Sequence, residues 1–144
     1  MKIAVVRIRG KRKVKPKIDR TLELLRLSRP NHCVIVDDSK PSIGMLGIVK
    51  DYVTFGKIDG ETLFKLIYKR GMKGSKRISE LSKKEEVQES AKKIFEGKMK
   101  LSEFINPVFM LNPPRKGYKS IKKAYPLGDL GKREEMNTLL RRMM

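Results

Sequence analysis

The sequence predicts an α+β fold that consists of a β-α-β-α-β unit followed by an α-rich C-terminal extension. Three short segments rich in β-branched residues, 2–8, 32–36 and 52–58, have the composition of strands. Two segments between them carry apolar residues at the spacing of one helix face. With 144 residues and 39% apolar content, the chain is long enough for one compact domain or for a small domain with an appended lobe.

The first helix is expected to begin at Pro16, after the first strand and a basic loop at 9–15. Proline is favoured in the first turn of a helix because its missing N–H would have no partner there. This helix should end near Ser28, before the breaker formed by 29–31. Its apolar positions share one face: Ile18, Leu22 and Leu25, with Leu24 and Leu27 widening the stripe.

The second helix follows the strand 32–36 and should open with the capping sequence 37–39 and Pro41. Its apolar positions face one way: Ile43, Leu46 and Val49. Gly44 and Gly47 weaken this helix by roughly 1 kcal/mol each relative to alanine, which suggests a close approach of the sheet or of an RNA backbone. Because crossover connections place helices on a face of the sheet, we expect the other face to be available.

The first domain is predicted to span 1–58, and a second lobe to span 59–144. Asp59 should cap the first helix of this lobe, and Gly71 should stop it. Its apolar positions are Leu63, Leu66 and Ile67.

Three further elements are expected in the extension. A capping box at 82–85 should open a helix that Gly97 closes, and a strand should follow at 108–111. Asp129 should cap the last helix. The apolar positions of these two helices are Val87, Ala91, Ile94 and Phe95, and Met136, Leu139, Leu140 and Met143.

Thirty-five Lys and Arg against 16 Asp and Glu give a formal charge of +19, and many of the basic residues form acid-free blocks at 9–17, 69–77 and 115–123. Like charges this close repel one another, so we expect them to meet a polyanion. We interpret 9–17 and 115–119 as phosphate-binding loops. Tyr118 could stack on an unpaired base or fill a gap in the protein.

The sequence offers no machinery for catalysis. One histidine, His32, and one cysteine, Cys33, cannot form a disulfide or a four-ligand zinc site within the chain. We expect Cys33 in the core, whereas His32 either touches RNA or caps its strand. The pair Asp37-Asp38 is better explained by the helix that it precedes than by Mg²⁺, and no nucleotide-binding loop is present. We therefore predict no enzyme activity, no cofactor and no bound metal.

No apolar run approaches the roughly 20 residues needed to span a bilayer. Arg7 and Arg9 interrupt the N-terminal apolar stretch, which predicts a strand rather than a signal peptide. We expect a cytoplasmic protein without a membrane partner.

Several segments resemble the L-thirty family of large-subunit ribosomal proteins, called L-seven in eukaryotes. In the first half they are VRIRG at 6–10, TLELLRL at 21–27, NHC at 31–33, SIGML at 42–46 and DYVTFG at 51–56. In the second half, PPRKGYK at 113–119 and GDLGKRE at 128–134 resemble the long form found in archaea and eukaryotes. The lack of a long basic N-terminal arm is similar to the archaeal type.

This resemblance implies a ferredoxin-like domain with an extension, bound to large-subunit ribosomal RNA beside neighbouring ribosomal proteins, as a structural component without enzyme activity. Its RNA-facing segments would be 9–17, 29–32, 40–45 and 115–119, the first three lying together if the second helix begins near the same sheet edge. With the lysines that close the third basic block, the predicted RNA-binding residues are Arg7, Arg9, Lys11, Arg12, Lys13, Lys15, Lys17, Arg29, His32, Lys40, Met45, Arg115, Lys116, Tyr118, Lys119, Lys122 and Lys123.

A different hypothesis is a free-standing RNA- or DNA-binding regulator that acts by itself in solution. Nonspecific binding to phosphates would serve such a protein as well. Association with the large ribosomal subunit distinguishes the two hypotheses.

Overall fold

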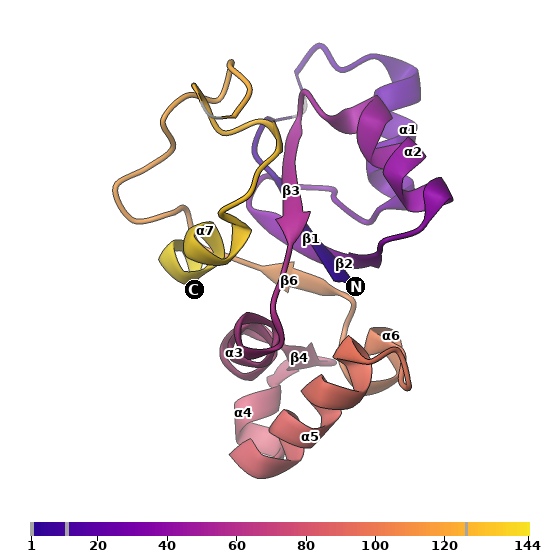
Figure 1. Cartoon of the computed structure of the whole chain (residues 1–144), viewed down its shortest axis with the longest axis vertical. Helices are drawn as coiled ribbons and strands as arrows, with labels where there is room; N and C mark the ends of the chain where they lie inside the picture. The colour runs from indigo at the N-terminus through magenta and orange to yellow at the C-terminus, as the bar shows by residue number, and fades with distance from the viewer. Residues whose placement is uncertain (1, 11, 126) are drawn as a thin grey trace.

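The centre of the molecule is a five-stranded mixed sheet with the strand order β6-β2-β1-β3-β7 (Figure 1). The computed structural model describes residues 2–10, 12–125 and 127–144. The strands of the sheet are β1 (Lys2–Arg7), β2 (His32–Asp37), β3 (Val53–Lys57), β6 (Val108–Met110) and β7 (Gly131–Lys132). The α+β class and the β-α-β-α-β order of the first half are confirmed.

β1 lies between β2 and β3 and runs antiparallel to both, so β2 and β3 are parallel to each other. Only the second helix therefore makes the expected crossover connection, and the expectation for the first helix is wrong. The reason is that the chain comes back to the end of β1 that it left. Asn31 N, just before β2, donates a hydrogen bond of 2.7 Å to Arg7 O at the end of β1.

Helices cover both faces of the sheet. Alternate residues of β1 point to opposite faces, and all four of Ile3, Ala4, Val5 and Val6 are buried. α1 (Pro16–Leu24) and α2 (Lys40–Val49) pack over Ile3 and Val5. α3 (Gly60–Arg70), α5 (Lys84–Phe95) and α7 (Met136–Met143) enclose a second core with Ala4 and Val6. The expectation of an available second face is therefore wrong.

The extension shares the sheet with the first half of the chain. β6 pairs with β2 in the antiparallel sense and β7 pairs with β3 in the parallel sense. The rest of the extension includes a hairpin of β4 (Met72–Lys73) and β5 (Lys76–Arg77) and the short helices α4 (Ile78–Leu81) and α6 (Leu101–Phe104). These elements and α5 lie at the lower end of Figure 1. A division into domains after residue 58 stays a prediction.

Several helix ends follow their local sequence. Ser39 Oγ accepts a hydrogen bond from Ser42 N at 3.4 Å, and Asp59 Oδ1 accepts one from Thr62 N at 2.7 Å, so both predicted caps are confirmed. Gly71 ends α3 as expected, in an extended conformation. A Cβ there would lie 2.3 Å from the carbonyl oxygen of Ile67, which explains the glycine.

Other ends differ from the predictions. α1 stops at Leu24 rather than near Ser28, because Arg26 adopts a φ of 63° and its amide bonds back to Glu23 O. Leu24, predicted to widen the apolar stripe of α1, is 66% exposed, and Ile43 of α2 is 52% exposed.

The capping box at 82–85 does not form. Lys83 is the N-cap of α5 and makes no side-chain capping bond, while Ser82 ends the preceding α4. Asp129 does not cap the last helix either, because α7 begins at Met136 and Asp129 is buried in a separate contact. The apolar residues predicted for the last helix are all buried as expected.

Across the described part of the chain, no helix combines the length and the apolar character required to cross a membrane.

Candidate nucleic-acid interface

The first basic loop is anchored at its base and exposed at its tip. The amides of Ile8 and Arg9 both donate to Tyr52 O, at 2.9 and 3.2 Å, and the Arg9 guanidinium lies 5.0 Å from the centroid of the Tyr52 ring. Four predicted cations that follow are exposed: Arg12, Lys13, Lys15 and Lys17. Lys11 lies outside the described residues. The loop therefore presents its charge from a fixed base.

Arg7 does not reach the surface. Its side chain is 1% exposed, and burial lowers the pKa of the guanidinium while the charges of Asp19 and Tyr52 oppose this shift. The guanidinium donates to three carbonyl oxygens: Arg9 O at 2.9 Å, Leu27 O at 2.6 Å and Gly10 O at 3.4 Å. A direct contact of Arg7 with RNA stays a prediction, and the burial argues against it, because the donors of the side chain are turned inward onto the backbone.

The turn before β2 lies next to this loop. Arg29 is exposed, and Asn31 has a φ of 67°. His32 is half-buried, and burial together with the charges of Arg29 and Arg7 lowers its pKa, which favours a neutral ring at neutral pH. Its Nδ1 is buried with no hydrogen-bond partner in the described structure. This geometry places His32 at the mouth of the strand and leaves both of its predicted roles open.

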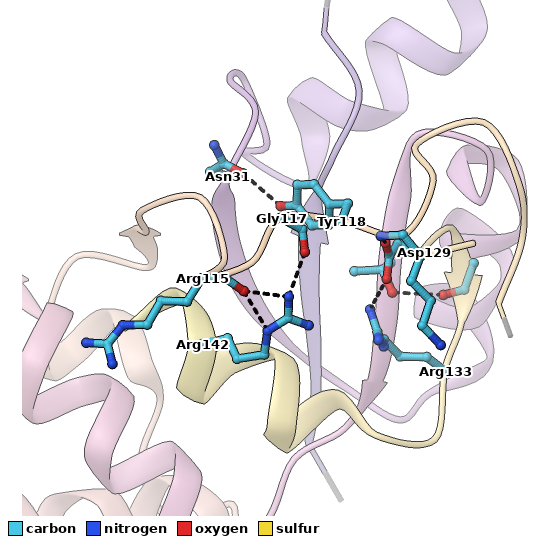
Figure 2. A network of polar contacts seen from close by, with 10 residues as sticks. Asn31, Arg115, Gly117, Tyr118, Asp129, Arg133 and Arg142 are labelled. Atoms are coloured by element: carbon cyan, nitrogen blue, oxygen red, sulfur yellow. Dashed lines mark hydrogen bonds and ion pairs between the residues drawn. The ribbon is translucent and has the colours of Figure 1, made fainter. Parts of the chain in front are cut away.

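The second basic loop is held by a polar network that Figure 2 shows. Arg142 Nη2 donates to Arg115 O and Gly117 O, both at 2.6 Å. Tyr118 Oη donates to Asn31 Oδ1 at 2.8 Å, which joins this loop to the turn before β2. The predicted cations of this block are all exposed: Arg115, Lys116, Lys119, Lys122 and Lys123.

Tyr118 fills a gap in the protein. Its ring packs against the core that α3, α5 and α7 enclose, and burial, aided by Asp129, raises the pKa of its hydroxyl to about 12. Between the two alternatives for this residue, the packing favours the structural one. Its contribution to a surface is to fix the positions of the charged neighbours on both sides.

A buried ion pair supports the far side of the same loop. Arg133 Nη1 and Asp129 Oδ1 are 3.2 Å apart, and their side chains are only 7% and 3% exposed. Asp129 also accepts a hydrogen bond from the amide of Lys119. The guanidinium of Arg133 lies 5.3 Å from the centroid of the Tyr125 ring. The pair thus ties the loop to the segment that leads into α7.

Three of the four predicted segments come together in the described structure, namely 9–17 without residue 11, 29–32 and 115–119. They adjoin the end of β1 and the starts of β2 and β3. The fourth segment, 40–45, lies near the opposite ends of the strands. The reason is that α2 follows the end of β2, where Asp37 pairs with Lys2 at the start of β1. The expectation that 40–45 clusters with the first two segments is therefore wrong. Lys40 is exposed there and Met45 is half-buried.

The outer face of α2 has a character of its own. Ile43, Gly44, Gly47 and Ile48 are exposed, and a Cβ added to either glycine would meet nothing within 4 Å. The two glycines were visible in the sequence, but the exposure of the isoleucines was not. The supporting role of four residues was not predicted, because no local pattern in the sequence marks these long-range contacts: Asn31, Asp129, Arg133 and Arg142.

No group of three or more His, Cys, Asp or Glu residues in the described ranges is arranged to hold a metal ion. Asp37 instead pairs with Lys2 across the β1–β2 ladder. Cys33 is fully buried, and desolvation raises the pKa of its thiol to about 12. The expected place of Cys33 in the core is confirmed.

The fold and the loops define a class: a basic α+β protein whose charged segments are exposed at one end of a sheet that is covered on both faces. A family model described as ribosomal protein L30p/L7e matches residues 3–53. The large ribosomal subunit protein uL30 of Methanococcus maripaludis is 47% identical over the whole of both chains. The chain belongs to this ribosomal protein family.

Further relatives carry the same name. The protein of Archaeoglobus fulgidus is 45% identical and covers 97% of this chain and 98% of its own. That of Thermoplasma volcanium is 42% identical and covers 99% of this chain and 92% of its own. The likeness to archaeal members therefore extends through the C-terminal extension, as the resemblance implied.

Proposed function

We propose that this protein is a structural constituent of the large ribosomal subunit in the cytoplasm, without enzyme activity, and that it binds ribosomal RNA through its basic loops. Family membership supports the subunit, because the relatives are named as proteins of it. The observation that carries the RNA contact is the juxtaposition of two basic loops at one end of the sheet. The bond between Tyr118 and Asn31 joins the second loop to the turn before β2, and this turn is bonded to the end of β1, where the first loop begins.

The proposed mechanism is electrostatic. Guanidinium and ammonium groups release condensed counterions when they neutralise phosphates, so binding should weaken steeply with salt. If about six phosphates are neutralised, the slope of log affinity against log salt should be about −4 to −5. The RNA-binding residues proposed for this end are the exposed ones: Arg12, Lys13, Lys15, Lys17, Arg29, Arg115, Lys116, Lys119, Lys122 and Lys123.

The two loops have different forms of support, and this matters for affinity. Backbone amides and Arg7 hold the first loop, while Arg142 and Asp129 hold the second. Because the loop bases are fixed in the free protein, less conformational entropy is lost when RNA binds. Arg9 and His32 lie beside the anchored ends of the loops. They would therefore be secondary contacts, reached only by RNA that enters between the loops.

We place a second, smaller RNA contact on α2, with Lys40 as its cation and Met45 at its margin. The exposed glycines leave room for a ribose-phosphate backbone to approach the helix closely. This surface is separate from the basic end, so the protein would touch two RNA segments. The helices α3 to α6 are then left for solvent or for neighbouring ribosomal proteins.

The test is sedimentation of tagged protein in a cell lysate through sucrose gradients at low and moderate salt. We expect the protein to comigrate with large subunits at both salt concentrations. A triple variant, Arg12→Gln with Lys13→Gln and Lys15→Gln, should shift toward the light fractions. The matched control replaces Lys84, Lys92 and Lys93, exposed on α5, with Gln.

Because both triple variants lose the same charge, only a specific role of the loop separates them. Equal behaviour of the two variants would argue against the loop as the contact. Wild-type protein that remains at the top of both gradients would overturn the ribosomal proposal and favour the free-standing regulator.

A further inference from the structure

We propose that Arg7 is a positioning residue of the RNA-binding surface, which sets the shape of two loops from inside the protein without touching RNA. This inference rests on the proposed function, since it concerns how the basic end is held. It is supported by a buried guanidinium and the carbonyl oxygens around it, which are independent of the exposed cations.

The carbonyls that Arg7 holds come from two different segments. Arg9 O and Gly10 O belong to the start of the first basic loop, at 2.9 and 3.4 Å, whereas Leu27 O belongs to the turn after α1, at 2.6 Å. The carbonyl of Arg7 itself accepts from Asn31 N at 2.7 Å. One residue thus fixes the first loop and both ends of the turn 27–31.

The same contacts continue into the second basic loop. Asn31, held by the Arg7 carbonyl, accepts the hydrogen bond of Tyr118 at 2.8 Å. The positions of the first loop, the turn and the second loop therefore all depend on Arg7. Replacing Arg7 should disturb the relative placement of the exposed cations, although those cations themselves are unchanged.

An arginine is needed because of its geometry. Its planar fork aims several N–H groups in fixed directions, while the ammonium of lysine is a single point on a flexible stem. No ion pair to Arg7 is found in the part of the chain that the structure describes. A buried cation whose hydrogen bonds all go to backbone carbonyls is satisfied only while the loops keep their shape, so the charge and the loop conformation depend on each other.

The position of Arg7 argues against a merely structural role in the core. It is the last residue of β1, and the carbonyls that its side chain holds lie outside β1 and β2. The apolar cores on the two faces of the sheet are made by other residues, including Ile3, Val5, Ala4 and Val6. Its polar contacts serve the loops rather than the strand pairing.

The decisive variant is Arg7→Lys, which keeps the charge and removes the fork. Arg20→Lys, at an exposed position of α1, is the matched control, and Arg12→Gln removes one proposed phosphate contact. Purified large-subunit ribosomal RNA is titrated with each protein over a range of salt concentrations. Hydrogen exchange of the free proteins reports the order of 9–15 and 27–31.

We expect Arg7→Lys to weaken RNA binding by about tenfold or more and to flatten the salt slope by about two contacts or more, although no charge is lost. Arg12→Gln should flatten it by about one contact. Amides in 9–15 and 27–31 should exchange faster in Arg7→Lys, while those of β1 and β3 keep their protection. Arg20→Lys should match the wild type in every measurement.

The proposal is overturned if Arg7→Lys keeps the wild-type affinity and salt slope, or if its affinity falls while loop exchange is unchanged. Should Arg7→Lys lose protection in β1 and β3 as well, the role is structural and the proposal is again wrong. Failure of the proposed function would look different, because the wild-type protein itself would then bind RNA without salt dependence.

Discussion

Replacing Gly44 and Gly47 together with alanine should stabilise the free protein and weaken its binding to RNA. Both glycines lie inside α2 and neither has a positive φ, so alanine fits the backbone there. A Cβ at either position would meet nothing within 4 Å. Nothing within the described protein therefore requires glycine at these two sites.

The magnitude follows from helix propensity. Each glycine costs roughly 0.8–1.0 kcal/mol relative to alanine in a helix interior, so the double variant should gain about 2 kcal/mol. For a chain of this size, about 1 kcal/mol corresponds to roughly 2–4 °C in Tm, which predicts a rise of about 4–8 °C. The two methyl groups would stand on the outer face of α2, where a close RNA backbone would be pushed away.

The assay combines thermal unfolding, followed by circular dichroism, with titration of large-subunit ribosomal RNA. A matched control is Gly56→Ala, because a Cβ at Gly56 would lie 2.4 Å from the Arg133 carbonyl oxygen. This control should lower Tm. If the double variant is more stable and binds RNA like the wild type, the reasoning about the outer face of α2 is refuted, and a fall in Tm would refute the propensity estimate.

Three further predictions concern polar and thiol groups. Burial alone would raise the pKa of Asp59, but the hydrogen bond from the Thr62 amide and the charges of Arg141 and Lys65 lower it overall. Its capping contribution to stability should therefore be complete above the unfolded pKa of about 3.9 and disappear as pH falls through the lower folded value. Asp59→Ala should lower the free energy of unfolding in urea by about 1 kcal/mol at pH 7 and by almost nothing in strong acid. Cys33, with its thiol pKa raised to about 12, should resist iodoacetamide at pH 8 in the folded protein and react once urea unfolds it; rapid labelling without urea would contradict its burial. Asp129→Asn leaves a buried arginine without its ion pair and should lower the free energy of unfolding by about 3–5 kcal/mol, a loss that chemical denaturation would reveal as a lower midpoint.

Local chemistry explains which parts of the fold could be predicted. Pro16, Ser39 and Asp59 act within one turn of their own helices, and each marks a helix start in the structure as it does in the sequence. The end of α1 was not predictable in this way, because Arg26 adopts the left-handed conformation that glycine usually provides. The sense of β2 relative to β1 also depends on where the chain returns, and no pattern in 8–31 encodes this.

The candidate site shows the same limit. Exposed cations such as Arg12 and Lys116 could be found because runs of like charge without acids are visible in the sequence. Arg7 lies two residues before the first basic block but is buried, because it still belongs to β1. Arg142, which holds the second loop, is 27 residues from Arg115 and 25 residues from Gly117 in the sequence. Only the folded chain brings them together.

The strand order has a consequence for the growing polypeptide. β6 and β7 occupy the two outer positions of the sheet, although they are separated in sequence from β1, β2 and β3 by more than half of the extension. A nascent chain that has produced only the first three strands has two unpaired strand edges, and such edges attract other chains. Long-range pairings of this kind also form slowly. Newly made protein is thus most prone to aggregate after β3 and before β6 has emerged from the ribosome, when both edges are open and a chaperone would be of most use.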